Sequence, residues 1–294
     1  MSRQVTPLSL DNTAAYAQWR AAKLDRLPAD LAWFIVEIGD PRHLTPAEHG
    51  ALLERLRCAN LAVYVSHTGD DPDKAIPRRL GAQFGLHRLD HNPGADADAI
   101  TSVRVQTDAG HAGYIPYTDR PIAWHTDGYY NAPGSQLGAF ILHCVRPAAS
   151  GGDNGLIDPE LLYIRLRDRD PAHIRALMHA AAMTIPANVV AGKVVRPVSV
   201  GPVFSANRQG RLAMRYTDRR RNIQWRDDPA TAAALAALRA LLEAPETLPV
   251  AIRLEPGWGV ICNNCLHRRG GFSDDPAYPR LLYRARYLDR IVGT

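Results

Sequence analysis

Short apolar runs, separated by glycine, proline and polar turn residues, recur along most of the chain. Runs of this length between turn signals are typical of the strands of a β-rich domain. The pattern predicts strands at 33–38, 61–65, 100–106, 135–145, 194–205, 212–216, 248–254, 258–263 and about 280–287. The runs at 194–205 and 212–216 are expected to pair around a turn at 207–210.

Helical patterns are fewer, and they lie early in the chain or are inserted between the strands. The clearest begins at Thr45-Pro46-Ala47-Glu48, where threonine can cap, proline fits the first turn and glutamate completes a capping box. Others are expected at 12–27, 76–84, 159–167, 171–181 and 230–242. We therefore predict a β-rich α+β fold, with a double-stranded β-helix (jelly-roll) core and flanking and inserted helices.

The 294 residues would fit one large domain or two ordinary ones. Because there is no internal repeat, low-complexity tract or linker, we predict a single domain over 1–294 with an N-terminal helical extension over about 1–30. The first residues have no secretory signal, and no apolar run is long enough to span a bilayer. The expected location is the cytoplasm.

The formal net charge is +5, and the densest basic cluster is Arg219-Arg220-Arg221. A nucleic-acid footprint would be a broader basic stripe, so this charge is interpreted as solvated surface, with some arginines able to face an anionic substrate. The expected partner is a small-molecule substrate, and neither nucleic acid nor a membrane is expected. Homo-oligomerisation is left open.

The segment 122–130 contains His125 and Asp127, two residues apart and flanked by aromatic residues. On extended backbone, side chains at i and i+2 point the same way, so an imidazole and a carboxylate can bind one metal ion together. With a second histidine from far along the chain, they would form the 2-His-1-carboxylate facial triad of non-haem Fe(II) oxygenases. A lone HxD motif is also common by chance.

Most of the other histidines lie in surface helices, polar loops or an apolar strand, but His267 ends an apolar run. Arg280 and Arg284 follow it, four residues apart. A buried arginine suits a dicarboxylate, since its planar fork meets a carboxylate through two parallel hydrogen bonds. Cys262 and Cys265 have CxxC spacing, which invites a redox or zinc interpretation. One pair in a strand-like segment instead favours ordinary reduced cysteines.

The ordered set His125-x-Asp127, His267 and Arg280 resembles the Fe(II)- and 2-oxoglutarate-dependent dioxygenases of the TauD/TfdA superfamily. The resemblance covers roughly residues 32–290. Further segments are similar to the γ-butyrobetaine hydroxylase branch: Tyr117-Thr118-Asp119-Arg120-Pro121, Leu142-His143-Cys144, Gly151-Gly152-Asp153-Asn154 and Asn263-Asn264-Cys265-Leu266-His267-Arg268-Arg269.

This resemblance implies that His125, Asp127 and His267 bind Fe(II). It also implies that Arg280 holds the distal carboxylate of 2-oxoglutarate, with Arg284 nearby. Asn154 stands where related enzymes have a threonine that helps to bind this carboxylate. The implied reaction uses O2 and decarboxylates 2-oxoglutarate to succinate and CO2, while a small molecule is hydroxylated, desaturated or cleaved.

The resemblance does not fix the substrate. Candidate substrate residues are Tyr117, Trp124, Tyr129, Tyr130, Arg215 and Tyr216, of which Arg215 and Tyr216 could meet an anionic group. The aromatic residues around the motif could box a quaternary ammonium group, or they could simply pack the core. Two alternative functions remain: a metal-dependent hydrolase that uses the same triad with zinc, and a non-catalytic metal-binding protein on this fold.

Overall fold

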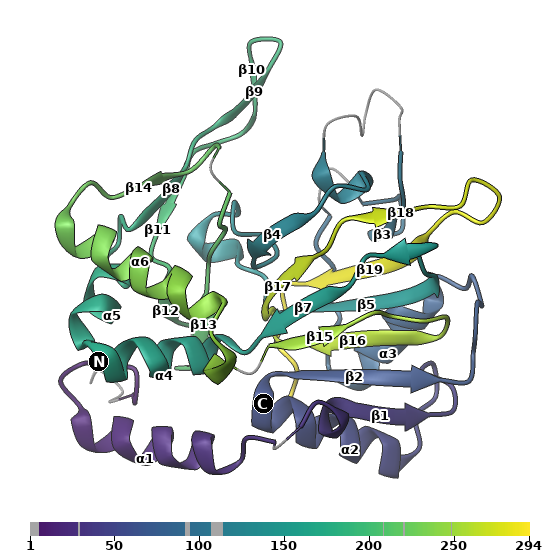
Figure 1. Ribbon diagram of the computed structural model, residues 1–294, viewed down its shortest axis with the longest axis horizontal. Coiled ribbons are helices and arrows are strands. Elements are labelled where there is room, and N and C mark those ends of the chain that lie inside the picture. Colours follow the sequence, from purple (N-terminus) through teal and green to yellow (C-terminus); the bar gives the residue numbers. More distant parts are fainter. Residues whose placement is uncertain are drawn as a thin grey trace. The chain divides into compact units, whose positions relative to one another are not determined.

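The computed structural model describes residues 6–28, 30–91, 95–106, 114–207, 209–219, 221–247 and 249–294 (Figure 1). Arg220 of the predicted basic cluster, Arg208 of the predicted turn and Leu248 of a predicted strand lie outside these ranges. The chain forms two compact units, each made of three stretches. Unit 1 comprises 1–27, 124–136 and 157–249, and unit 2 comprises 28–123, 137–156 and 250–294. The single domain over 1–294 stays a prediction.

Unit 2 is built on a six-stranded sheet in the order β1-β2-β16-β5-β19-β3 (Figure 1). Its first two strands are parallel, and the other pairs are antiparallel. A four-stranded sheet has the order β15-β7-β17-β4, and β18 pairs with β6. The strands are β1 Ile35–Ile38, β2 Leu61–Ser66, β3 Ile100–Val103, β4 Ile122–His125, β5 Ala139–Arg146, β6 Ser150–Gly151, β7 Asn154–Ile157, β15 Val250–Ile252, β16 Trp258–Cys262, β17 Leu266–Arg269, β18 Phe272–Ser273 and β19 Leu281–Tyr287.

Two clusters of buried side chains hold unit 2 together. One joins the six-stranded and four-stranded sheets, with Val63 and Val260 from the former and Leu156 and Val250 from the latter. The other lies on the opposite side of the six-stranded sheet, where α2 (Pro46–Ala59) and α3 (Ala75–Gln83) contribute apolar residues such as Leu52. Burial on both faces explains why β2 is an almost continuous apolar run rather than an alternating one. Short 3₁₀ helices add Ala32–Phe34 and Ile115–Tyr117. The protein is therefore a mixed α/β structure rich in sheets.

The start of α2 confirms the predicted capping box. Thr45 Oγ1 accepts a hydrogen bond from the Glu48 backbone N–H at 3.3 Å, and Glu48 Oε2 accepts one from the Thr45 backbone N–H at 2.7 Å. These reciprocal bonds satisfy two amides that a helix start otherwise leaves without a partner.

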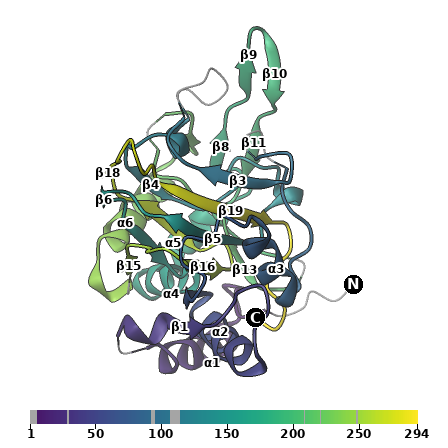
Figure 2. The ribbon, with the colours of Figure 1, turned by 90° about the vertical axis from the view of Figure 1, so that its right-hand side faces the viewer.

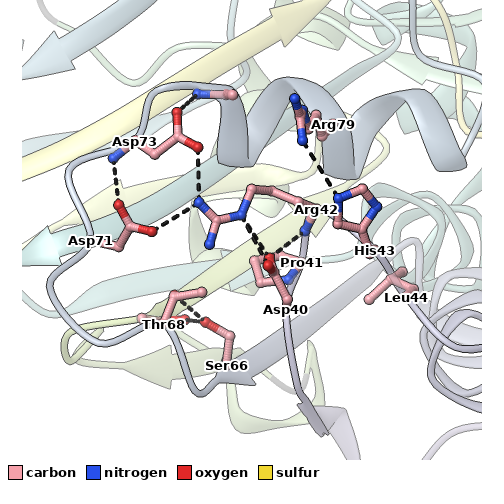
Figure 3. A network of polar contacts seen from close by, with 12 residues as sticks. Asp40, Pro41, Arg42, His43, Leu44, Ser66, Thr68, Asp71, Asp73 and Arg79 are labelled. Atoms are coloured by element: carbon pink, nitrogen blue, oxygen red, sulfur yellow. Dashed lines mark hydrogen bonds and ion pairs between the residues drawn. The ribbon is translucent and has the colours of Figure 1, made fainter.

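Arg42 ties the chain after β1 to the turn between β2 and α3 (Figure 3). Its Nε donates to Asp40 at 2.9 Å, and its Nη1 donates to Asp71 and to Asp73 at 2.9 Å each. Asp73 also accepts from the Ala75 backbone N–H at 2.8 Å, which anchors the first turn of α3. Because exposed ion pairs contribute little one by one, the network acts by ordering these loops together.

Unit 1 contains the helices α1 Thr13–Asp25, α4 Pro159–Arg169, α5 Pro171–Leu177 and α6 Pro229–Leu242, with short 3₁₀ helices at Pro133–Ser135 and Pro245–Thr247. Its sheets are β11-β8-β14 and the two-stranded pairs β9–β10 and β12–β13. The strands are β8 Met183–Ile185, β9 Asn188–Val190, β10 Lys193–Arg196, β11 Ser199–Gly201, β12 Phe204–Ala206, β13 Leu212–Met214 and β14 Gln224–Trp225. The β9–β10 hairpin extends from β8 and β11 (Figures 1 and 2).

The N-terminal helix α1 is attached to α4 by charged groups. Lys23 Nζ lies 2.5 Å from Asp158 and 2.7 Å from Glu160, and its side chain is only 5% exposed. Burial disfavours the charged ammonium, but the two carboxylates outweigh it and raise the pKa of Lys23. No helix in the described ranges is long and apolar enough to cross a membrane.

Candidate metal centre

The HxD motif lies at the end of β4, where unit 1 holds the backbone in an extended form. His125 forms an antiparallel bridge with Thr217. The Thr126 backbone N–H donates to the Tyr216 carbonyl at 3.0 Å, and the Asp218 backbone N–H donates to the Trp124 carbonyl at 2.9 Å. This pairing fixes the backbone on which the two side chains of the motif are carried.

The chain turns directly after the motif. Asp127 is 5% exposed, and Gly128 has a φ of +65°, a left-handed conformation that favours glycine. The Asn131 backbone N–H closes this turn by donating to the Gly128 carbonyl at 2.8 Å. The turn explains the glycine that follows the motif in the sequence.

His267 lies in β17, with its ring against Phe140 at a centroid distance of 4.6 Å. Its Nδ1 is 3.0 Å from the Cys265 carbonyl oxygen, which can only accept a hydrogen bond. Nδ1 therefore carries the proton, and Nε2 has the lone pair that a metal ion needs. A metal-binding histidine commonly has such a backbone partner.

One ring nitrogen of His125, one carboxylate oxygen of Asp127 and one ring nitrogen of His267 all lie within 4.8 Å of one another. Two imidazole nitrogens and one carboxylate oxygen form a donor set suited to a divalent first-row metal ion, and they leave further coordination positions for other ligands. The three residues singled out from the sequence are thus brought together, and they fit such an ion.

Arg280, just before β19, lines a small pocket in unit 2. The pocket is lined by Pro147, Ala148, Gly151, Gly152, Asn154, Arg253, Leu254, Arg280 and Leu282. Arg280 is 3% exposed, and its Nη1 has no hydrogen-bond partner among the described residues. A buried cation of this kind fits an acidic ligand, because buried charges are normally paired.

The glycine pair brings the backbone close to this arginine. Gly151 has a φ of +71°, and a Cβ there would lie 2.5 Å from the Gly271 carbonyl oxygen. A Cβ on Gly152 would lie 3.9 Å from Arg280 Nε. Asn154 is 9% exposed, and its amide donates to the Gly152 carbonyl at 3.5 Å. The structure thus brings the predicted Asn154 to the same pocket as Arg280.

Arg269, which the sequence analysis did not single out, holds the loop that precedes β4. Its Nη2 donates to the carbonyls of Thr118 at 2.7 Å and Arg120 at 2.6 Å, and its Nη1 donates to that of Pro116 at 3.3 Å. The sequence feature that could have indicated this role is the position of Arg269 two residues after His267, which places both side chains on the same side of the strand. Burial, together with the neighbouring charges of Arg280 and Arg284, lowers the pKa of Arg269 to about 9.

Replacing Arg269 with alanine is expected to lower the free energy of unfolding by about 2–3 kcal/mol, because buried carbonyls would lose their donors. Urea titration followed by circular dichroism measures this change. Arg146→Ala is the matched control, since Arg146 donates to a single carbonyl, that of Pro279, in an exposed contact. Equal stability losses in the two variants would contradict the anchoring role of Arg269.

Arg215 corrects a prediction. Its guanidinium donates to the carbonyls of Tyr129, Met183, Gly201 and Ser199 and to Ser199 Oγ, at distances from 2.7 to 3.4 Å. All five of its N–H groups are thus used within unit 1. Burial lowers its pKa to about 10. Arg215 is therefore a structural anchor and has no donor left for an anionic substrate.

The other candidate substrate residues divide by burial. Tyr117, Trp124 and Tyr216 are at most 4% exposed. Trp124 Nε1 donates to Glu243 at 3.4 Å, and Tyr216 Oη donates to Asp218 at 3.2 Å. Tyr129 and Tyr130 are half-buried. Packing therefore accounts for the first three, and Tyr129 and Tyr130 remain the candidates with accessible surface.

The CxxC cysteines lie inside unit 2. Cys262 and Cys265 are both free thiols, fully buried in the cluster between the two sheets. Cys265 Sγ donates to the Asn60 carbonyl at 3.3 Å. These positions are those of core residues.

Comparison with known proteins gives a family match over most of the chain. A family model described as taurine catabolism dioxygenase TauD, TfdA family matches residues 35–286. A uridine-5′-phosphate dioxygenase from an Amycolatopsis species is 31% identical over 273 residues, which cover 85% of this chain and 94% of that protein. A second, from a Streptomyces species, is 32% identical over 207 residues, or 66% of this chain and 71% of that protein.

A solved structure of similar fold is that of an asparagine oxygenase in complex with Fe(II), 3-hydroxyasparagine and succinate. The two chains share 16% sequence identity with a TM-score of 0.57, over 98% of this chain and 86% of the other. At this identity the likeness concerns the fold.

Proposed function

The chain belongs to the TauD, TfdA family of dioxygenases, and from that premise we propose that it oxidises uridine-5′-phosphate or a closely related nucleotide at a centre formed by His125, Asp127 and His267. It is an Fe(II)- and 2-oxoglutarate-dependent dioxygenase. The observation that carries the proposed centre is the convergence of its three donor atoms within 4.8 Å.

In this proposal His125, Asp127 and His267 hold Fe(II). The Cys265 carbonyl fixes the tautomer and orientation of His267. The pairing of residues 124–126 with 216–218 sets the backbone that carries His125 and Asp127. Bound Fe(II), with 2-oxoglutarate and O2, supplies the oxidising chemistry in which 2-oxoglutarate is decarboxylated to succinate and CO2.

Arg280 is proposed to bind the distal carboxylate of 2-oxoglutarate through its buried guanidinium, with the Asn154 amide as a second donor. Gly151 and Gly152 have no side chains, so the backbone lies close to Arg280 at this pocket. Arg284 is proposed to add positive charge nearby, since it acts electrostatically on Arg269 together with Arg280. Burial of Arg280 excludes water, which strengthens its pairing with a carboxylate.

The proposed substrate class rests on the two uridine-5′-phosphate dioxygenases that resemble this chain. The first of them aligns over nearly its whole length, so the likeness extends beyond the metal-binding segments. We further propose that the two sheets of unit 2 form the jelly-roll core expected from the sequence. The assignment to the γ-butyrobetaine hydroxylase branch stays a prediction.

Aerobic incubation of the purified protein with Fe(II), 2-oxoglutarate and uridine-5′-phosphate is expected to release succinate well above the level without nucleotide. In a parallel anaerobic titration, Fe(II) and 2-oxoglutarate should produce a visible charge-transfer absorption. If the absorption appears but uridine-5′-phosphate does not stimulate succinate release, the proposed substrate is wrong. Nucleotide turnover that requires neither O2 nor 2-oxoglutarate would contradict the proposed function.

A further inference from the structure

Two tyrosines extend from the metal centre along the turn after the HxD motif. The ring of Tyr129 meets that of His125 edge-on, at a centroid distance of 6.4 Å and an interplanar angle of 87°. Tyr130 meets Tyr129 edge-on at 5.2 Å. Both tyrosines are half-buried, so each also has accessible surface. This pair, Tyr129 and Tyr130, is the aromatic surface next to the first proposed iron ligand within unit 1.

Arg219 lies beside this tyrosine pair. Its Nη1 donates to the Tyr129 hydroxyl at 3.0 Å. Its backbone position is fixed because it follows the segment 216–218 that pairs with the HxD strand. The side chain is exposed, and no carboxylate among the described residues forms an ion pair with it. Arg219 is thus a cation that contacts Tyr129, whose ring in turn contacts His125.

Arg196 approaches the same pair from another element. It ends β10, and its guanidinium carbon lies 5.7 Å from the ring centroid of Tyr130. Its Nη2 donates to the Pro186 carbonyl at 2.7 Å and its Nη1 donates to the Pro197 carbonyl at 3.3 Å, which fixes the side chain at the base of the β9–β10 hairpin. It also forms no ion pair with a described carboxylate. Two guanidinium groups therefore flank one tyrosine pair.

Two other arginines of unit 1, Arg239 and Arg20, have their charge balanced by a carboxylate. Arg239 pairs with Asp218 at 3.0 Å, and Arg20 pairs with Asp168 at 2.8 Å. Arg219 and Arg196 keep an uncompensated charge beside an aromatic surface. A planar guanidinium is well suited to bind phosphate oxygens through paired, charge-assisted hydrogen bonds.

We propose that Arg219 and Arg196 form the site that recognises the phosphate group of the nucleotide, an inference that rests on the proposed function. The Tyr129 hydroxyl positions Arg219, and the Tyr130 ring positions Arg196. The site makes the enzyme select a nucleoside monophosphate over the nucleoside. The sequence predicted that the short cluster Arg219–Arg221 is solvated surface. In this proposal its first residue, Arg219, binds the phosphate group.

The test compares uridine-5′-phosphate with uridine in the wild type, Arg219→Gln and the double variant Arg219→Gln/Arg196→Gln. The measured quantity is the ratio of the two KM values from succinate formation. In the wild type we expect uridine-5′-phosphate to have the lower KM. Loss of charge-assisted bonds should shrink this preference by about 10- to 100-fold in Arg219→Gln, and further in the double variant. Arg221→Gln, an exposed arginine of the same cluster, is the matched control and should keep the wild-type ratio.

Calorimetric titration of iron-free protein with each compound gives a second measurement, independent of turnover. The inference is supported if affinity for uridine-5′-phosphate falls in Arg219→Gln but not in Arg221→Gln. It is overturned, with the proposed function intact, if wild type uses the nucleotide and the variants keep its preference over uridine. If neither compound binds or stimulates succinate formation in the wild type, the proposed substrate class is wrong and the phosphate site is wrong with it.

Discussion

Replacing His267 with alanine is expected to remove iron binding and to lower substrate-dependent succinate formation by more than about 100-fold, since loss of even an outer-shell partner costs 10- to 100-fold. The residue supplies one of three donor atoms that lie within 4.8 Å of one another. The two remaining ligands, His125 and Asp127, are two residues apart in the chain and leave one side of the ion without a protein ligand. Iron content after desalting, measured by a colorimetric chelator, checks the first part, and succinate release checks the second.

His87→Ala is the matched control, because His87 is an exposed histidine of unit 2. It should retain iron and activity at the wild-type level. His267 lies beside Phe140, so its loss could also loosen the core. His267→Gln therefore accompanies the alanine variant, as it keeps most of the side-chain volume. A glutamine variant that folds and holds a full equivalent of iron would refute the ligand assignment.

Replacing Arg280 with glutamine is expected to raise the KM for 2-oxoglutarate by about 100-fold while iron stays bound. A bidentate pair to a carboxylate involves charge-assisted hydrogen bonds of about 1.5–3 kcal/mol each, and 1.4 kcal/mol corresponds to a factor of ten. Arg280 is 3% exposed and its Nη1 has no hydrogen-bond partner among the described residues, so this group is available to the carboxylate of 2-oxoglutarate. Succinate formation over a range of 2-oxoglutarate concentrations measures the effect.

Arg253→Gln is the control for this prediction. Arg253 lines the same pocket, but it is paired with Glu255 at 3.1 Å and donates to the Ala148 carbonyl at 2.8 Å. Its replacement should change the KM for 2-oxoglutarate only slightly. If Arg280→Gln behaves like Arg253→Gln, and Arg284→Gln raises the KM instead, the carboxylate is bound by Arg284.

Features that depend on neighbouring residues could be predicted from the sequence. Thr45 to Glu48 contain every group of the capping box, so α2 begins where expected. His125 and Asp127 are two residues apart, so local backbone geometry brings their side chains together. The convergence of His267 with them depends on sheet order, and no local pattern specifies it. Here the family resemblance supplied what the spacing could not.

The predictions that the structure contradicts, and the residues that were missed, have other physical causes. The predicted strand 194–205 is wrong, because it consists of parts of β10, β11 and β12. Pro197 and Pro202 separate these pieces, since proline has no N–H to donate within a sheet. Arg215 and Arg269 were misjudged or missed because their partners are backbone carbonyls. Any residue type presents a carbonyl, so the sequence gives no sign of such a partner.

Arginines that bind backbone carbonyls should be retained when related enzymes acquire new substrates, whereas exposed arginines should be replaced more often. Arg215 donates hydrogen bonds to four backbone carbonyls from a single guanidinium. A lysine has one ammonium group and does not reproduce this geometry. Arg215 should persist in relatives whatever they oxidise. Among the described residues, the Arg219 side chain donates only to the Tyr129 hydroxyl, so exchange of this side chain would disturb little of the scaffold. Relatives that retain Arg215 but have another residue at position 219 would then be those whose substrates differ in charge.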